Sequence, residues 1–206
     1  MTVLALLRHA ETEWSAQKRL QGRTDIPLSG AGRAALAGRG VPGLCADMRV
    51  VSSPLQRCVE TAQCLRLARA HIEPRITEMS WGAWEGRTLP LLRQQLGETM
   101  RANEEQGMDF LPPGGESPRQ VLQRVQPWLA EVARAGQPTL AVSHRGVIRV
   151  IFAAATGWDM LGRPPARLDW SCVHLFELDA SGHAAVLRLN LPLVVVPPDL
   201  YNLGVG

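Results

Sequence analysis

The sequence predicts an α/β fold, specifically a three-layer α/β/α sandwich with a mostly parallel sheet and an antiparallel edge. Short apolar runs of strand length alternate with segments of helical periodicity along most of the chain. Two later runs, separated by the turn residues 179–182, have the pattern of an antiparallel hairpin. The chain has 206 residues, of which 46% are hydrophobic and 20% charged. We therefore expect a single domain, residues 1–206, around one sizeable core.

The first half of the chain is expected to alternate between strands and helices. Residues 3–7 are a short apolar run typical of a strand that is buried on both faces. Ser53 and Pro54 have the pattern of a helix cap followed by a first-turn proline. In chain order, the expected elements are a strand at 3–7, a helix at 29–40, a strand at 48–52, a helix at 54–69 and a strand at 72–76.

The second half continues this alternation and ends in an apolar tail, residues 191–206, which we expect to be extended. Ser117 and Gln120 form a capping-box pattern that begins a helix. In chain order, the expected elements are a helical segment at 87–106, a helix at 117–135, a strand at 139–143, a helix at 146–156 and the hairpin strands at 173–178 and 184–189.

The composition argues against several classes of protein. The formal net charge is only +3, which does not indicate a nucleic-acid partner. No apolar run approaches membrane-spanning length, and the N-terminal run lacks the basic region of a signal peptide. Cys45, Cys58, Cys64 and Cys172 have no metal-ligand spacing, so we expect free thiols in a reducing compartment. We therefore expect a cytoplasmic protein with no membrane partner, and the tail leaves a homodimer open.

Charged and polar side chains gather where three of the predicted strands end. Arg8 and His9 follow the first strand, Arg57 lies in the first turn after the second, and His144 follows a later one. The carboxyl ends of parallel strands meet at one edge of the sheet, where ligands bind in open α/β folds. Two of these junctions also begin helices, whose free N–H groups favour anions. The sequence therefore predicts a site for a phosphate-like dianion.

These residues resemble the histidine phosphatase superfamily, the phosphoglycerate-mutase-like proteins with an Arg-His-x-Glu motif. The resemblance covers most of residues 3–156 in the family's order. Its motifs are Leu7-Arg8-His9-Ala10-Glu11-Thr12, Gly22-Arg23, Asp25-Ile26-Pro27-Leu28-Ser29, Ser52-Ser53-Pro54-Leu55 with Arg57 and Thr61-Ala62, Glu78 with Trp81-Gly82 and Trp84-Glu85-Gly86, Gly114-Gly115-Glu116-Ser117, and Val142-Ser143-His144-Arg145-Gly146.

The resemblance implies a role for each of these site residues. His9 would be the nucleophile that forms a phosphohistidine, and Glu78 would donate a proton to the leaving group, with Glu85 as a nearby competitor. The remaining implied residues are Arg8, Arg57 and His144 on the phosphoryl oxygens, His144 also counting as catalytic, and Gln21, Gly22, Arg23 and Thr24 on the substrate side. No metal and no other cofactor is expected, since arginine can neutralise the phosphoryl charge.

Three positions depart from the family's pattern. Ala10 replaces a glycine, and Ser15 stands where asparagine is common, which puts one substrate hydrogen bond in doubt. Arg145 stands where glycine is frequent. It either adds positive charge to the pocket or points away along its helix, and we favour the second arrangement.

The resemblance implies a metal-independent phosphomonoesterase that hydrolyses a small phosphorylated metabolite. The alternative is a cofactor-dependent phosphoglycerate mutase, which shares the nucleophile but carries a longer, more basic insertion before the second histidine. Here that segment, residues 87–115, is short, and we expect it to form a lid over the substrate. A third reading, a non-catalytic phosphate-binding module, is disfavoured because His9, Arg57 and Glu78 are all present.

Overall fold

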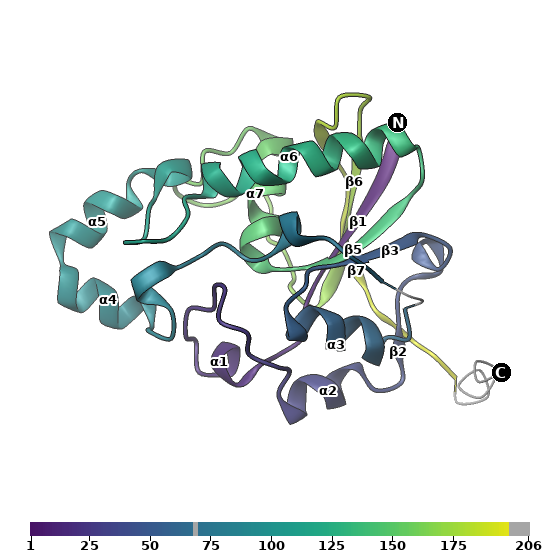
Figure 1. Ribbon diagram of the computed structural model, residues 1–206, viewed down its shortest axis with the longest axis horizontal. Coiled ribbons are helices and arrows are strands. Elements are labelled where there is room, and N and C mark those ends of the chain that lie inside the picture. Colours follow the sequence, from purple (N-terminus) through teal and green to yellow (C-terminus); the bar gives the residue numbers. More distant parts are fainter. Residues whose placement is uncertain (68–69, 198–206) are drawn as a thin grey trace.

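The computed structural model describes residues 1–67 and 70–197. Its strands are β1 (Thr2–Arg8), β2 (Arg39–Gly40), β3 (Arg49–Ser52), β4 (His71–Ile72), β5 (Thr139–Ser143), β6 (Cys172–Leu178), β7 (Ala184–Pro192) and β8 (Val194–Val195). Six of them form the central sheet, in the order β4-β3-β5-β1-β6-β7 (Figure 1). The first four of these are parallel, whereas β6 and β7 run antiparallel. The predicted sheet, mostly parallel with an antiparallel edge, is confirmed.

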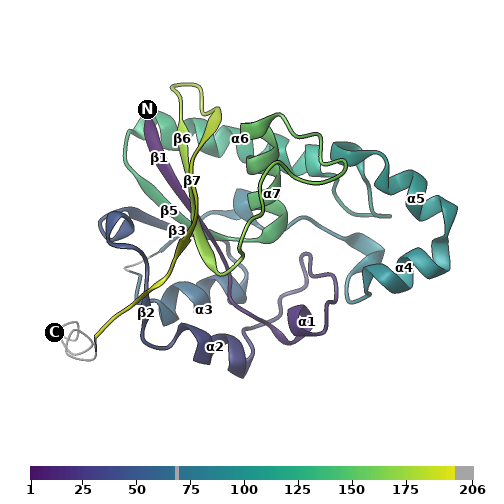
Figure 2. The same ribbon diagram turned by 180° about the vertical axis from the view of Figure 1, so that it is seen from behind.

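The α-helices of the described residues are α1 (Glu13–Ala16), α2 (Gly30–Leu36), α3 (Gln56–Cys64), α4 (Leu89–Leu96), α5 (Glu98–Glu104), α6 (Pro118–Ala135) and α7 (Arg145–Thr156). Short 3-10 turns lie at Gly43–Cys45, Pro74–Ile76, Gly82–Trp84 and Gly107–Asp109. α6 and α7 cover one face of the sheet, and α2 and α3 cover the other (Figures 1 and 2).

The central strand β1 shows why the sheet is buried on both faces. Successive side chains of a strand point to opposite faces. Leu4 and Leu6 belong to the apolar cluster that contains the side chains of α6 and α7. Ala5 and Leu7 belong to the cluster on the α2 side. All four are at most 2% exposed, so the uninterrupted apolar run of β1 supports three layers.

Local signals place two elements as predicted. Ser117 Oγ accepts a hydrogen bond from the Gln120 backbone N–H at 3.2 Å, and Gln120 Oε1 accepts one from the Ser117 N–H at 2.8 Å. The capping box at the start of α6 is thereby confirmed. The hairpin of β6 and β7 is also confirmed, with β7 reaching Pro192.

The helix predicted at 29–40 is too long at its C-terminal end. Ser29 caps α2 as expected, but the helix ends at Leu36. Gly38 has a φ of +69°, which an α-helix does not accommodate. Arg39–Gly40 then pairs with Val194–Val195 of the tail as a small antiparallel sheet. The tail thus packs on its own chain at β8, and its residues 198–206 lie outside the described residues.

The predictions around the second and third strands also need correction. The helix predicted at 54–69 begins at Gln56 with Leu55 as its N-cap residue, and it ends at Cys64. Arg69 lies outside the described residues. The strand predicted at 72–76 is only His71–Ile72, because Pro74 lacks a backbone N–H and begins a 3-10 turn.

The segment predicted as one helical stretch at 87–106 is two helices. Gly97, with a φ of +50°, separates α4 from α5. Both views show this pair at one end of the molecule, away from the sheet (Figures 1 and 2). A small apolar cluster of Leu20, Trp84, Leu92 and Met100 holds it there.

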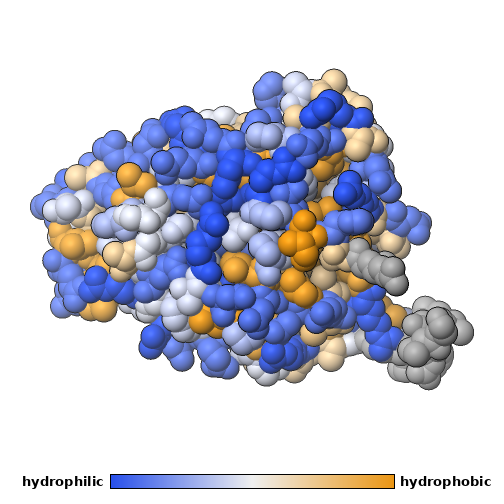
Figure 3. Space-filling view, viewed as in Figure 1, coloured by the Kyte–Doolittle hydropathy of each residue, from blue (hydrophilic) through white to orange (hydrophobic). Residues whose placement is uncertain are grey.

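Three further features of the structure are its surface, its cysteines and the length of its helices. The face seen in Figure 3 is mostly hydrophilic, with scattered hydrophobic patches. All four cysteines are free thiols. Within the described part of the chain, every helix is too short or too polar to cross a bilayer.

Candidate active site

The three strand ends singled out above do meet at one edge of the sheet. In the parallel pairing of β1 with β5, Arg8 lies opposite Ser143. In the pairing of β3 with β5, Ser52 lies opposite Val142. The His9 backbone N–H donates to the Ser143 carbonyl at 2.9 Å. The pairing of β1 with β5 thus continues up to His9 and His144.

His9 is held as a neutral imidazole with one defined tautomer. Its side chain is buried, and Nδ1 lies 2.7 Å from the carbonyl oxygen of Ala10. A carbonyl oxygen can only accept, so Nδ1 carries the proton and Nε2 keeps its lone pair. Burial, followed by the charges of Arg8 and Arg57, holds the pKa of His9 well below its usual value. His9 therefore offers an uncharged nitrogen with a free lone pair at neutral pH.

His144 lies next to His9 with the opposite tautomer. Its ring is fully buried, and its centroid is 5.3 Å from that of His9. Arg57 Nε donates to His144 Nδ1 at 3.3 Å, so Nε2 holds the proton and donates to Ser53 Oγ at 2.7 Å. Burial and then Arg57 keep the pKa of His144 well below its usual value. The hydroxyl of Ser53, predicted to cap a helix, instead pairs with this histidine.

Arg57 is fully buried behind the two histidines. Besides its bond to His144, Nη1 donates to the Thr24 carbonyl at 3.0 Å and Nη2 donates to the Gly22 carbonyl at 2.9 Å. The backbone of the loop that contains Gly22 and Thr24 therefore fixes the guanidinium plane, and each Nη keeps a second hydrogen.

The four residues predicted on the substrate side have different surroundings. Gln21 lines a cavity that also contains His9, and its Nε2 donates to Thr12 Oγ1. Gly22 and Thr24 hold Arg57 through their carbonyl groups. The side chain of Arg23 forms an ion pair with Glu116 at 3.1 Å. Of the four, only Gln21 is brought to the cavity wall.

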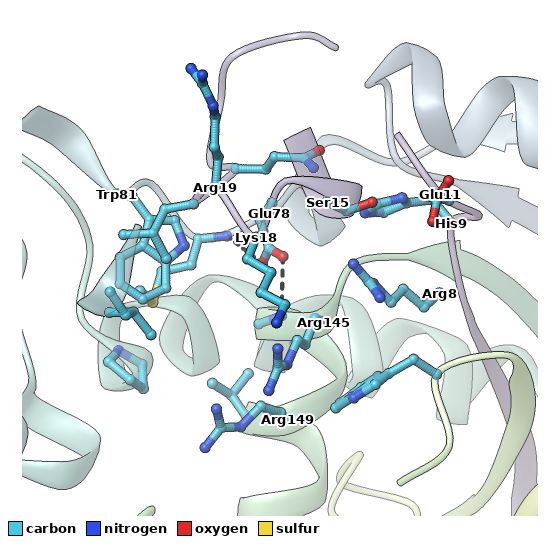
Figure 4. A pocket seen from close by; sticks show the side chains of 18 of the residues that line it. Arg8, His9, Glu11, Ser15, Lys18, Arg19, Glu78, Trp81, Arg145 and Arg149 are labelled. Carbon is cyan, nitrogen blue, oxygen red and sulfur yellow. Dashed lines mark hydrogen bonds between the residues drawn. The ribbon is translucent and has the colours of Figure 1, made fainter. Parts of the chain in front are cut away.

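That cavity has a volume of about 1210 Å³ and contains Arg8, His9 and Glu78 in its wall (Figure 4). Arg8 Nε is buried, and it has no hydrogen-bond partner among the described residues. A buried donor without a partner is costly, and an anion in the cavity would satisfy it. Arg57 and His144 lie behind this wall rather than in it.

Glu78 is a buried carboxyl group with two backbone partners. Oε1 accepts from the Met79 N–H at 2.8 Å, and Oε2 accepts from the Gly146 N–H at 3.1 Å. Burial raises the pKa of Glu78, although these two hydrogen bonds and the nearby arginines act against the rise. The group is thus suited to hold a proton and to release it.

Gly146 contributes to this arrangement, and sequence reasoning gave it no role of its own. A Cβ atom at this position would lie 2.3 Å from Glu78 Oε1. A side chain here would displace the carboxyl oxygen, so glycine allows helix α7 to approach the group this closely. The signal in the sequence was the glycine two residues after His144, within a helix that is otherwise rich in branched residues.

Glu85, the competitor of Glu78, holds the loop before α2. Its carboxylate accepts hydrogen bonds from Thr24 Oγ1 and from the backbone N–H groups of Arg23, Thr24 and Trp81. Burial alone would raise its pKa, but these hydrogen bonds lower it. Glu85 therefore remains ionised, which fits a structural role better than proton donation.

The prediction that the Arg145 side chain points away along its helix is wrong. Its side chain lines the cavity together with Arg149 and Lys18 (Figure 4). The Arg145 guanidinium carbon lies 5.2 Å from the centre of the Trp170 ring, which explains the direction of the side chain. The sequence contained a signal for Arg149, since residues four apart share one face of a helix.

Within residues 1–67 and 70–197, His, Cys, Asp and Glu side chains form no group of three or more that could hold a metal ion. The positive charges in the cavity wall are those of arginine side chains and of Lys18. Chemically, the site combines a neutral imidazole, fixed positive charge and a carboxyl group with a raised pKa.

Comparison with known proteins agrees with this geometry. The model of the histidine phosphatase superfamily (branch 1) matches residues 4–191. The chain belongs to the histidine phosphatase superfamily. Phosphoserine phosphatase 1 of Hydrogenobacter thermophilus is 34% identical to it over 203 residues, which cover 93% of each chain. A solved phosphoserine phosphatase from Entamoeba histolytica, in complex with 3-phosphoglyceric acid, is 25% identical with a TM-score of 0.75, over 92% of this chain and 97% of that chain.

One relative in this superfamily is much longer than the chain. A bifunctional protein of Mycobacterium tuberculosis is 36% identical over 203 residues, which are 92% of this chain but 54% of that protein. The chain therefore spans about half the length of the first curated relatives that it matches.

Proposed function

We propose that the protein is a metal-independent phosphomonoesterase that hydrolyses small phosphorylated metabolites through a phosphohistidine on His9. The main support is the neutral imidazole of His9, with its free Nε2 lone pair, together with Arg8 in the same cavity wall, whose buried Nε lacks a partner. The names of similar proteins point the same way, since two of them are phosphoserine phosphatases.

In the first step, Nε2 of His9 attacks the phosphorus atom and the bond from phosphorus to the ester oxygen breaks. Protonated Glu78 gives its proton to that oxygen, and the alcohol leaves. Arg8 binds the phosphoryl oxygens from the cavity wall, and the charge of Arg57 behind the wall stabilises them. His144, which accepts a hydrogen bond from Arg57, holds that guanidinium in position. Arginine keeps its charge at any working pH, so no metal is needed for this task.

In the second step, water attacks the phosphohistidine. The Glu78 carboxylate takes a proton from the water, the bond between phosphorus and nitrogen breaks, and inorganic phosphate leaves. His9 and Glu78 return to their starting protonation states. In this scheme, α4 and α5 form the lid over the substrate, since Leu89, Arg93 and Glu104 line the cavity.

A mutase would pass the phosphoryl group to a second substrate instead of water. We favour hydrolysis because the segment 87–115 is short and leaves water access to the phosphohistidine. Release of inorganic phosphate from 3-phosphoglycerate should therefore be faster than its conversion to the 2-isomer. The opposite ranking would identify a mutase. A cytoplasmic location and a homodimer remain predictions.

The test of this proposal is to trap the intermediate. After incubation with substrate and an alkaline quench, mass spectrometry should find a phosphoryl group on His9, because phosphohistidine is labile in acid. His9→Ala should lose this label and phosphatase activity while the protein stays folded. Near wild-type hydrolysis by His9→Ala would disprove the mechanism.

A further inference from the structure

We propose that Arg145, Arg149 and Lys18 form a second anion-binding subsite in the same cavity. The subsite would select phosphomonoesters whose leaving group carries another anionic group, a carboxylate or a second phosphate. This inference rests on the proposed phosphatase function and adds the class of substrate. Figure 4 shows the three side chains directed into the cavity that also contains Arg8 and Glu78.

The three cations are not neutralised by the protein. Within the part of the chain that the structure describes, none of them forms an ion pair or a side-chain hydrogen bond. The other carboxylates of the cavity wall do not supply a partner either. Glu104 pairs with Arg93 at 2.7 Å, Glu11 accepts from Ser29 Oγ at 3.1 Å, and Glu78 bonds to backbone N–H groups.

Aromatic rings hold the two guanidinium groups in place. The guanidinium carbon of Arg145 lies 5.2 Å from the centre of the Trp170 ring, and that of Arg149 lies 5.3 Å from the centre of the Trp158 ring. A ring at this distance attracts the guanidinium charge without using its N–H groups as hydrogen-bond donors to the protein. Two such groups, four residues apart on α7, lie on one face of the helix and line the same cavity, where both can bind an anion.

The subsite lies close enough to the phosphoryl end to act on one substrate. Helix α7 begins directly after His144, so Arg145 is the next residue in the chain after a residue of the phosphoryl site. Arg145 also lowers the pKa of both Arg8 and Arg149, after burial as the larger cause in each case. The charge of Arg145 therefore acts both on Arg8, at the phosphoryl site, and on Arg149, one turn further along α7. A phosphoryl dianion bound at Arg8 would not neutralise the charge of Arg149, which leaves that charge for a second anionic group.

The experiment compares substrates that differ by a single anionic group. One pair is 3-phosphoglycerate and glycerol 3-phosphate, and the other is fructose 1,6-bisphosphate and fructose 1-phosphate. The ratio of kcat/KM within each pair is measured for the wild type, Arg145→Gln and Arg149→Gln. Arg188→Gln, an exposed arginine on the edge strand β7, is the control with the same change of charge.

We expect the wild type to favour the more anionic member of at least one pair, and each cavity variant to reduce that ratio roughly 10- to 100-fold, as for loss of a hydrogen bond between charged groups. Arg188→Gln should keep the wild-type ratio. If the subsite binds a carboxylate, the ratio for the phosphoglycerate pair should change in the cavity variants. If it binds a phosphate, the ratio for the fructose phosphate pair should change.

Three results would overturn the inference. The first is a wild type with no preference in either pair, the second is a preference that survives both cavity variants, and the third is an equal reduction of the preference in Arg188→Gln. In each of these cases phosphate is still released, so the proposed function stands. Absence of phosphate release from every substrate, p-nitrophenyl phosphate included, would refute the proposed function and this inference with it.

Discussion

The substitution Glu78→Gln tests the least direct of the proposed roles. A general acid matters only if the leaving oxygen is too basic to depart as an anion. An alkyl alcohol needs the proton, whereas p-nitrophenol, with a pKa of about 7, can leave without it. Glutamine keeps the size and polarity of Glu78 but has no proton to give. The variant should therefore slow phosphoenzyme formation from alkyl phosphates by roughly 100-fold or more, and that from p-nitrophenyl phosphate far less.

The structure explains why the comparison between substrates is needed. Both oxygens of Glu78 accept backbone N–H groups, from Met79 and Gly146. The amide of glutamine can accept only one of these, and its NH₂ group faces the other donor. This mismatch should destabilise the protein by about 1–3 kcal/mol. It affects both substrates alike, so it cancels in the ratio of their rates.

The assay is rapid-quench measurement of phosphoenzyme formation with glycerol 3-phosphate and p-nitrophenyl phosphate. Phosphoenzyme formation is chosen because Glu78 is also proposed to activate water in the second step. Glu85→Gln is the matched control, and its losses should be similar on both substrates, since Glu85 holds the loop at Arg23 and Thr24. Equal losses in Glu78→Gln would refute the acid role, and a substrate-dependent loss in Glu85→Gln would transfer that role to Glu85.

Three other predictions concern the effect of metal removal, the space beside Glu78 and the pH dependence of stability. Activity should survive treatment with EDTA, and a loss that a divalent ion restores would contradict the proposed use of Arg8 and Arg57. Gly146→Ala should reduce kcat for glycerol 3-phosphate because its Cβ would lie 2.3 Å from Glu78 Oε1, whereas Gly30→Ala, with no atom within 4 Å of its Cβ, should match the wild type. The free energy of unfolding, measured with urea, should fall as pH drops from 7 to 5.5. The pKa values of buried His9, His144 and His174 are lowered, so the unfolded chain binds more protons below about pH 6.5. The loss approaches about 1.4 kcal/mol per pH unit for each histidine, and Glu78, with its raised pKa, opposes it by one proton at most. A constant free energy over this range would show that these histidines are not held neutral.

The sequence was informative where one local pattern decides the outcome. The uninterrupted apolar run of β1 predicted a strand buried on both faces, and the capping box at Ser117 predicted the start of α6. The strand ends at Arg8 and His144 predicted the edge where the site lies, since parallel strands share that edge.

The sequence was uninformative where a distant contact overrides the local pattern. Ser53 before Pro54 is a good helix start by itself, yet its hydroxyl pairs with His144, which is 91 residues away. The helix predicted to reach Gly40 ends early, because Arg39–Gly40 pairs with Val194–Val195 near the other end of the chain. The direction of Arg145 depends on Trp170, a partner that no periodicity in the sequence identifies.

Arg57 shows how the fold prepares this site for a dianion. Its charge is fully buried and lowers the pKa of both histidines, yet within the described residues no carboxylate lies within ion-pair distance of it. Carbonyl groups of Gly22 and Thr24 orient the guanidinium but do not cancel its charge. Burial accordingly lowers the pKa of Arg57 itself. Such a charge is least stable in the empty site and most stable beside an anion. In the proposed reaction, the same uncompensated charge that keeps His9 neutral for attack would also attract the phosphoryl group that His9 attacks.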